Sequence, residues 1–101
     1  MIYFTQLIYI LDGKEKTFLE FEDVAIPLIA KYHGKLLLRY RPTADNIIEK
    51  NMEMPYEIHL VEFEKEEDVA AFFRDEERKK FLYLKEQSIK STWLIKGSKL
   101  G

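Results

Sequence analysis

The sequence contains no cysteine. Disulfides, thiolate nucleophiles and cysteine-ligated metal or iron–sulfur centres are therefore excluded. It holds only two histidines, His33 and His59, and the long segment between them matches no zinc-ligand spacing. Nothing in the sequence around either histidine marks it as the axial ligand of a haem. We therefore expect neither a metal nor a cofactor.

The sequence also has no long apolar run and no long run of charges of one sign. No run approaches the roughly 20 residues that a helix needs to cross a bilayer. The first residues, MIYFTQL, include neither a basic segment nor a small-residue cleavage site. We expect a cytoplasmic protein that binds no membrane. Basic and acidic residues alternate, as in RDEER at 74–78, and the net charge is -2. This pattern is unlike a phosphate-binding surface, so we expect no nucleic-acid partner.

What is present is typical of a globular domain. Of the 101 residues, 47% are hydrophobic and 34% are charged, close to the averages for such domains. A chain of this length is sufficient for one domain around one core. We expect residues 1–101 to form a single α+β barrel domain.

The chain repeats one pattern of strand, helix and strand. Four breaker-free or alternating apolar runs predict strands: they are Ile2–Leu11, Lys35–Arg41, Tyr56–Phe63 and Ser91–Lys96. Apolar residues at three- and four-residue intervals predict a helix from Lys14 to Gly34 and helical structure over Glu66–Glu86. The order βαββαβ predicts a ferredoxin-like fold, a four-stranded antiparallel sheet with helices on one face.

Local signals add detail to the two helical segments. Gly34 is expected to end the first helix in the left-handed conformation, with His33 in its last turn. Glu22 is expected to face water. Asp75, followed by two acidic residues, reads as a new N-cap, so the second segment is either one long helix or two shorter ones.

The strands carry large apolar side chains on both faces, although helices can cover only one. The uncovered face is expected to include polar residues as well: Arg39 and Arg41 beside Leu37, and Glu57 with His59. A face this apolar is stabilised by burial, so we expect a homodimer packed sheet against sheet. The long connection Thr43–Met54 is expected to cover a pocket or a neighbouring subunit, or else to extend a strand.

Two segments resemble a known family. They are IPLIAKYHGK at 26–35 and VEF at 61–63 followed by DVAAF at 68–72. Together they are similar to the domain-of-unknown-function family 1330, in the dimeric α+β barrel superfamily. The resemblance implies a dimeric α/β barrel. Distant relatives include cofactor-independent oxygenases, small-molecule isomerases and haem-binding enzymes, so it implies a fold more than an activity.

Five polar residues on the strands are candidates for ligand binding. His59, with Glu57 two positions away, is either a general base or ligand-orienting group, or, in the interpretation we favour, a histidine satisfied within an interface. Arg39 and Arg41 either clamp a carboxylate or, as we favour, pair with Glu57. Gln6 lies among apolar residues, where its amide needs a partner.

Three functional hypotheses follow. The first is a homodimer that binds a small, partly apolar molecule, with no reaction assigned. The second is a cofactor-independent monooxygenase or isomerase acting on a small aromatic or anionic substrate, with His59 as base and Arg39 or Arg41 orienting an anionic group. The third is a dimer that only interacts with other proteins. A cavity with His59 or Gln6 exposed to it would favour the first two.

Overall fold

The computed structural model describes residues 1–101. Its elements in chain order are strand β1 (Ile2–Ile10), helix α1 (Glu15–Lys31), strand β2 (Gly34–Tyr40), the 3-10 turn η1 (Ala44–Asn46), strand β3 (Glu57–Phe63), helices α2 (Glu66–Phe73), α3 (Glu76–Lys80) and α4 (Leu82–Ser88), and strand β4 (Ile89–Gly97). The four predicted strands are all present. No helix is both long enough and apolar enough to cross a membrane.

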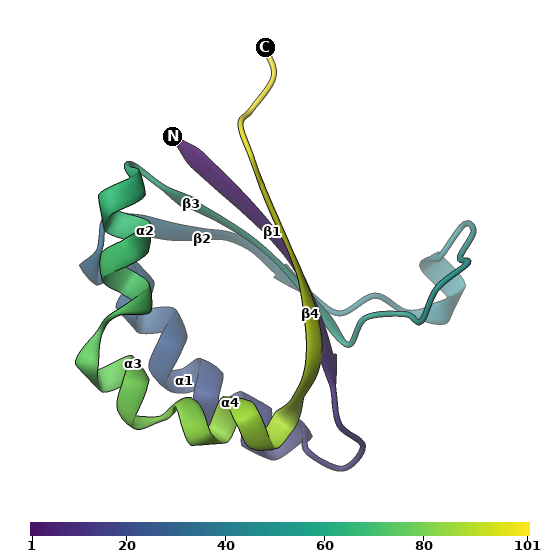
Figure 1. Ribbon diagram of the computed structural model, residues 1–101. Helices are drawn as coiled ribbons and strands as arrows, with labels where there is room; N and C mark the ends of the chain where they lie inside the picture. The colour runs from purple at the N-terminus through teal and green to yellow at the C-terminus, as the bar shows by residue number, and fades with distance from the viewer.

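The strands form one antiparallel sheet in the order β2-β3-β1-β4. All four helices lie on the same side of this sheet, which curves around them (Figure 1). The ferredoxin-like α+β fold predicted from the βαββαβ pattern is therefore confirmed.

The second helical segment divides into three short helices, where the sequence predicted one or two. Asp75 separates α2 from α3 and caps α3, since its Oδ1 accepts a hydrogen bond from the Arg78 backbone N–H at 2.9 Å. The predicted N-cap is confirmed. The two breaks make the helical layer follow the curved sheet (Figure 1).

The end of α1 differs from the prediction. The left-handed residue is His33, with φ of 60°, and not Gly34. Gly34 is required for a different reason, because a Cβ there would lie 2.6 Å from Ile29 Cγ2 and 2.6 Å from Phe63 Cε1. The glycine lets the start of β2 pass close against helix α1 and strand β3. Its role is close packing.

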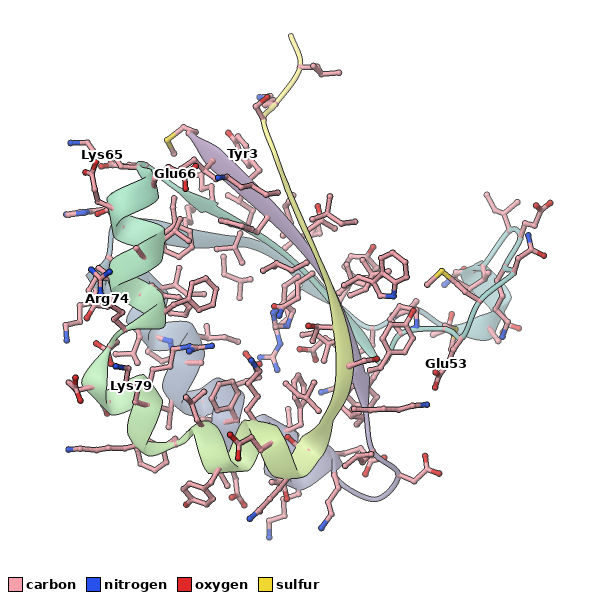
Figure 2. The ribbon with its side chains drawn as sticks, in the orientation of Figure 1. Tyr3, Glu53, Lys65, Glu66, Arg74 and Lys79 are labelled. Carbon is pink, nitrogen blue, oxygen red and sulfur yellow. The ribbon has the colours of Figure 1, made fainter.

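The apolar core lies between sheet and helices. One buried cluster joins α1 and α2 to strand β3 and consists of Leu28, Ile29, Val61, Phe63, Val69 and Phe72. A second joins α1 to α4 and consists of Phe21, Ala25 and Leu84. Side chains from both layers point into the space between the sheet and the helices (Figure 2).

The connection 43–54 extends away from the rest of the molecule (Figure 1). Ile48 is fully exposed and Met52 is half-exposed. The segment returns to the sheet at Glu53, whose carbonyl accepts a hydrogen bond from the Tyr9 hydroxyl at 2.9 Å. The prediction that this connection covers a pocket of its own chain is therefore wrong. Covering a neighbouring subunit stays a prediction.

Candidate functional site

The polar residues of β3 face the helices. Glu57, His59, Val61 and Phe63 are all buried and alternate with more exposed residues, so the face they share is the covered one. The prediction that Glu57 and His59 lie on the uncovered face is wrong. The alternation correctly separated the two faces of the strand, but because both faces are rich in apolar residues it could not indicate which one the helices cover.

A bulge in β2 places the arginines on the same covered side. Leu36 pairs with Val61 and Leu38 pairs with Leu60, which leaves Leu37 as an extra residue. Arg39 then pairs with His59 and shares its face. The predicted grouping of Arg39 and Arg41 with Leu37 is therefore wrong, because the extra residue reverses the alternation at that point.

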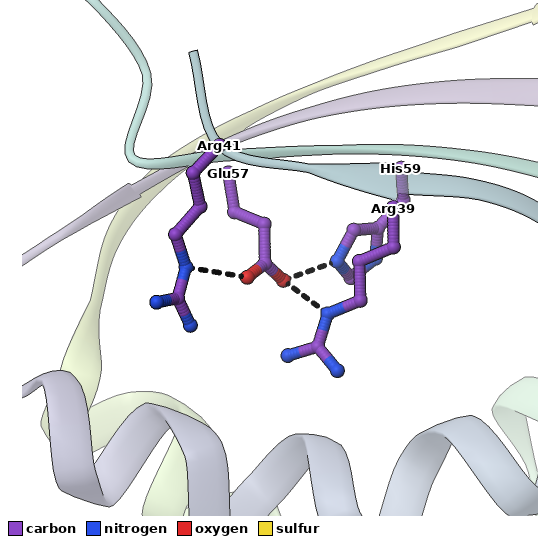
Figure 3. A network of polar contacts seen from close by, with 4 residues as sticks. All are labelled: Arg39, Arg41, Glu57 and His59. Carbon is purple, nitrogen blue, oxygen red and sulfur yellow. Dashed lines mark hydrogen bonds and ion pairs between the residues drawn. The ribbon is translucent and has the colours of Figure 1, made fainter. Parts of the chain in front are cut away.

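Glu57 is the centre of a polar network (Figure 3). Its Oε2 accepts hydrogen bonds from Arg39 Nε at 2.8 Å and from His59 Nε2 at 2.5 Å, and its Oε1 accepts one from Arg41 Nε at 3.1 Å. Glu57 is 1% exposed. The favoured prediction that the two arginines pair with Glu57 is confirmed. A buried carboxylate with three charge-assisted partners is well satisfied.

The network keeps Glu57 ionised. Burial by itself would raise the pKa of Glu57, but the hydrogen bonds from His59 and Arg39 outweigh this effect and lower the pKa to about 2. A carboxylate can only accept, so His59 Nε2 carries the hydrogen in this bond. Glu57 thus sets both the orientation and the tautomer of the imidazole.

A cavity of about 140 Å³ lies between the sheet and the helices. Two of the predicted site residues, Gln6 and His59, line it from the sheet, where they are paired across β1 and β3. Glu57, Arg39 and Arg41 do not line the cavity. Glu57 holds His59 by a hydrogen bond, and the two arginines in turn bind Glu57.

The helices contribute three charged residues to the cavity wall that the sequence did not single out. They are Glu22 on α1, Arg78 on α3 and Lys85 on α4. Glu22 is 7% exposed, so the expectation that it faces water is wrong. A signal for its position was available, because Glu22 lies four residues after Phe18 and three before Ala25, on the apolar side of the helix.

Burial perturbs all three of these groups. It raises the pKa of Glu22, an effect opposed by the charges of His59 and Arg39. Burial lowers the pKa of Arg78, opposed by Glu22 and Asp75. It also lowers the pKa of Lys85, and the nearby charge of Arg78 adds to that effect. Such perturbed groups around one cavity are typical of a functional site.

The remaining histidine lies elsewhere. His33 is exposed at the end of α1, and its Nδ1 lies 3.1 Å from Asp68 Oδ1. The hydrogen bond to Asp68 raises the pKa of His33. His33 does not line the cavity. This ion pair joins the end of α1 to the first turn of α2.

Comparison with known proteins supports the fold. No family model matches the chain, and no curated protein matches it. A solved protein of unknown function from Rhodopseudomonas palustris has a TM-score of 0.82 at 11% identity, covering 99% of this chain and 82% of that one. An uncharacterized NIPSNAP domain protein from Burkholderia xenovorans has a TM-score of 0.69 at 13% identity, covering 99% and 95%.

A third solved structure, a dabb family protein from Mesorhizobium loti, is described as having a ferredoxin-like fold. It has a TM-score of 0.67 at 11% identity and covers 99% of this chain and 97% of that one. Identities this low establish a shared architecture and no shared activity. These three solved structures therefore support the ferredoxin-like α+β fold. The resemblance to family 1330 stays a prediction.

Proposed function

We propose that this protein is a homodimer of the dimeric α+β barrel type that binds a small, partly apolar molecule in the cavity between sheet and helices. The observation that carries the proposal is His59, a buried imidazole that lines the cavity and is held at its Nε2 by Glu57. Most of the other lining residues are hydrophobic. A mostly apolar cavity with a few placed polar groups is the usual composition of a small-molecule site.

His59 has one ring nitrogen left for a ligand. Its Nε2 is occupied by Glu57, and Nδ1 makes no side-chain hydrogen bond. In the neutral ring, Nδ1 is then an acceptor, suited to a hydroxyl or another donor of the ligand. Gln6, its neighbour on β1, offers both a donor and an acceptor. The favoured interpretation of His59 as an interface residue is less well supported than a ligand-facing role.

The dimer is inferred from the uncovered face of the sheet. Leu38, Trp93 and Ile95 are each about half-exposed, and the strand pairing places all three opposite to the helix-covered side. Tyr40, which pairs with Ile58, and Leu37, which lines one shallow hollow with Leu60 and Ile95, add to this surface. A contiguous apolar surface of this kind is typical of a protein interface. A second copy packed sheet against sheet would bury it.

A ligand-binding experiment tests the proposal. Titrating small aromatic alcohols and acids into ¹⁵N-labelled protein should shift the backbone amides of residues around the cavity. His59→Gln should weaken the binding of hydroxyl-containing ligands by about tenfold, the effect of losing one hydrogen bond to a buried group. His33→Gln, which changes the chain's other histidine outside the cavity, should leave binding unchanged. Equal effects of the two substitutions would contradict the proposal.

The second candidate function, a cofactor-independent isomerase or monooxygenase, is favoured by the Glu57–His59 pair. A carboxylate that orients an imidazole also stabilises the imidazolium formed when Nδ1 takes a proton. In an isomerase, Nδ1 would remove a proton from one carbon of the substrate and return it to another. Arg39 and Arg41 are engaged by Glu57 and do not line the cavity, so they support this role less directly.

The enzyme hypothesis has its own assay. Quinols and other small aromatic substrates would be incubated with the protein under oxygen, with His59→Gln in parallel. Turnover that depends on His59 would support catalysis, and equal turnover in the variant would remove this residue from the mechanism. The third hypothesis, a dimer that only binds proteins, does not require a cavity lined by an oriented histidine.

A further inference from the structure

Arg78 is a buried cation whose guanidinium contacts no carboxylate directly, although the charges of Glu22 and Asp75 act on it. The residue is 7% exposed, and its guanidinium makes neither a hydrogen bond to another side chain nor an ion pair. Its Nε is buried and has no hydrogen-bond partner. A guanidinium has five N–H donors. Leaving the Nε donor unpaired away from water costs free energy, so this position calls for an acceptor.

Three aromatic rings surround the Arg78 guanidinium. Its Cζ lies 4.9 Å from the ring centroid of Phe73, 5.3 Å from that of Phe72 and 5.9 Å from that of Phe21. These cation–π contacts stabilise the charge but offer no hydrogen-bond acceptor in the plane of the guanidinium. They hold the group in place and leave its N–H groups available to a molecule in the cavity.

The charges around the cavity favour an anion. The charged lining residues are two cations, Arg78 and Lys85, and one carboxylate, Glu22. Outside this lining, the partly exposed Arg39 and Arg41 share the buried carboxylate Glu57, and the buried Asp75 pairs with Lys31. The lining itself therefore has one more cation than carboxylate, although the whole chain has a net charge of -2. This local excess of positive charge would attract a negatively charged ligand.

The size of the cavity restricts the ligand to a small molecule. Its volume of about 140 Å³ is close to that of a cavity of about 150 Å³ known to hold benzene. Phe73 and Leu94, both lining residues, are roughly half-exposed, which marks the side on which the cavity reaches solvent. One aromatic ring or a short aliphatic chain with a single charged group would fit.

We propose that the cavity binds a small apolar carboxylic acid, with the carboxylate on the Arg78 guanidinium and the apolar body extending toward His59 and Gln6. Arginine binds carboxylates through two parallel N–H···O bonds, which Lys85 could not replace. The inference rests on the proposed function, because it assumes that this cavity is the ligand site, and it adds the chemical class of the ligand. Glu22 would oppose binding as long as it is ionised.

The test compares benzoate with benzyl alcohol, which has the same ring and no charge. Both are titrated into ¹⁵N-labelled protein and followed by amide chemical shifts. Benzoate should bind more tightly than benzyl alcohol to the wild type. Arg78→Gln should weaken benzoate binding about tenfold or more and leave benzyl alcohol nearly unaffected. Arg74→Gln, the same substitution at an exposed arginine of the neighbouring turn, is the matched control and should change neither.

Two further variants keep the inference testable. Arg78→Lys retains the charge but not the paired donors, so its affinity for benzoate should fall between those of the wild type and Arg78→Gln; it replaces the glutamine variant if the latter does not fold. Glu22→Gln removes the competing carboxylate and should tighten benzoate binding several-fold. Weaker benzoate binding in Glu22→Gln would overturn the inference, because Glu22 would then be a partner of the ligand.

The outcomes separate this inference from the proposed function. If benzoate and benzyl alcohol bind equally well and neither depends on Arg78, the carboxylate assignment is wrong and the cavity is still a ligand site. If neither ring compound shifts the amides around the cavity, both proposals fail. If benzoate alone binds and its binding depends on Arg78, both are supported.

Discussion

Replacing the central carboxylate, in Glu57→Gln, tests whether the Glu57 network stabilises the fold. The fall of the Glu57 pKa from its usual 4.5 to about 2 corresponds to about 3 kcal/mol of stability at neutral pH. Arg39 and Arg41 are partly exposed, so they can turn toward water when the carboxylate is lost. We therefore expect Glu57→Gln to lower the free energy of unfolding at pH 7 by about 2 to 3 kcal/mol.

The pH dependence gives a sharper form of this prediction. Because the folded pKa lies below the unfolded one, the stabilisation is complete above about pH 5 and is lost as the pH falls through 4.5 toward 2. Between pH 7 and pH 3, the difference in stability between wild type and Glu57→Gln should shrink by about 2 kcal/mol. Other carboxylates titrate in both proteins and cancel in this difference.

The measurement is urea unfolding at the two pH values and at one fixed protein concentration, since a dimer's stability depends on concentration. Glu53→Gln is the control. Glu53 is an exposed carboxylate paired only with Lys90, and its loss should cost less than about 1 kcal/mol. A stability difference between wild type and Glu57→Gln that stays constant from pH 7 to pH 3 would refute the assignment of Glu57 as an ionised, stabilised group.

Three further predictions concern packing, assembly and the end of α1. Gly34→Ala should cost about 1 to 3 kcal/mol in urea unfolding, because its Cβ would meet side chains of α1 and β3, whereas Gly97→Ala, with open space around it, should be nearly neutral. Trp93→Lys should weaken the dimer about tenfold or more in sedimentation equilibrium, and Tyr83→Lys, at a similarly exposed aromatic on α4, should not; a wild type that is monomeric at micromolar concentration would refute the dimer. His33→Gln should remove a stabilisation that is present at low pH and lost as the pH rises through the raised pKa of His33; identical pH profiles for variant and wild type would refute that contribution.

Much of the architecture could be predicted from local patterns. The four strands appear where alternating and breaker-free apolar runs indicated them, and Asp75 caps a helix as its acidic neighbours suggested. The pairing of Arg39 and Arg41 with Glu57 was expected because buried charges require partners, but the face on which it forms was not, because the bulge at Leu37 sets it. The strands and the N-cap depend only on residues close in sequence.

The cavity could be predicted only in part. His59 and Gln6 were identified because polar residues in apolar strands are unusual, and both line the cavity. Arg78 was not identified, because in sequence it is one charge in an alternating run, and only the short helix α3 turns it inward. Asp75 marks where this five-residue helix begins, but no local pattern specifies where it ends or which of its sides packs against the cavity.

The sequence by itself determined the order of strands and helices, the apolar character of both sheet faces and the set of polar residues available to a site. The tertiary structure decided which face the helices cover, and the bulge at Leu37 decided that Arg39 and Arg41 join Glu57 and His59 on that face. The alternation along a strand divides its side chains between two faces but does not say which face is buried. Only the packing of the helices against one face makes that face the interior. The candidate site exists because the helices cover the sheet face that carries its polar residues.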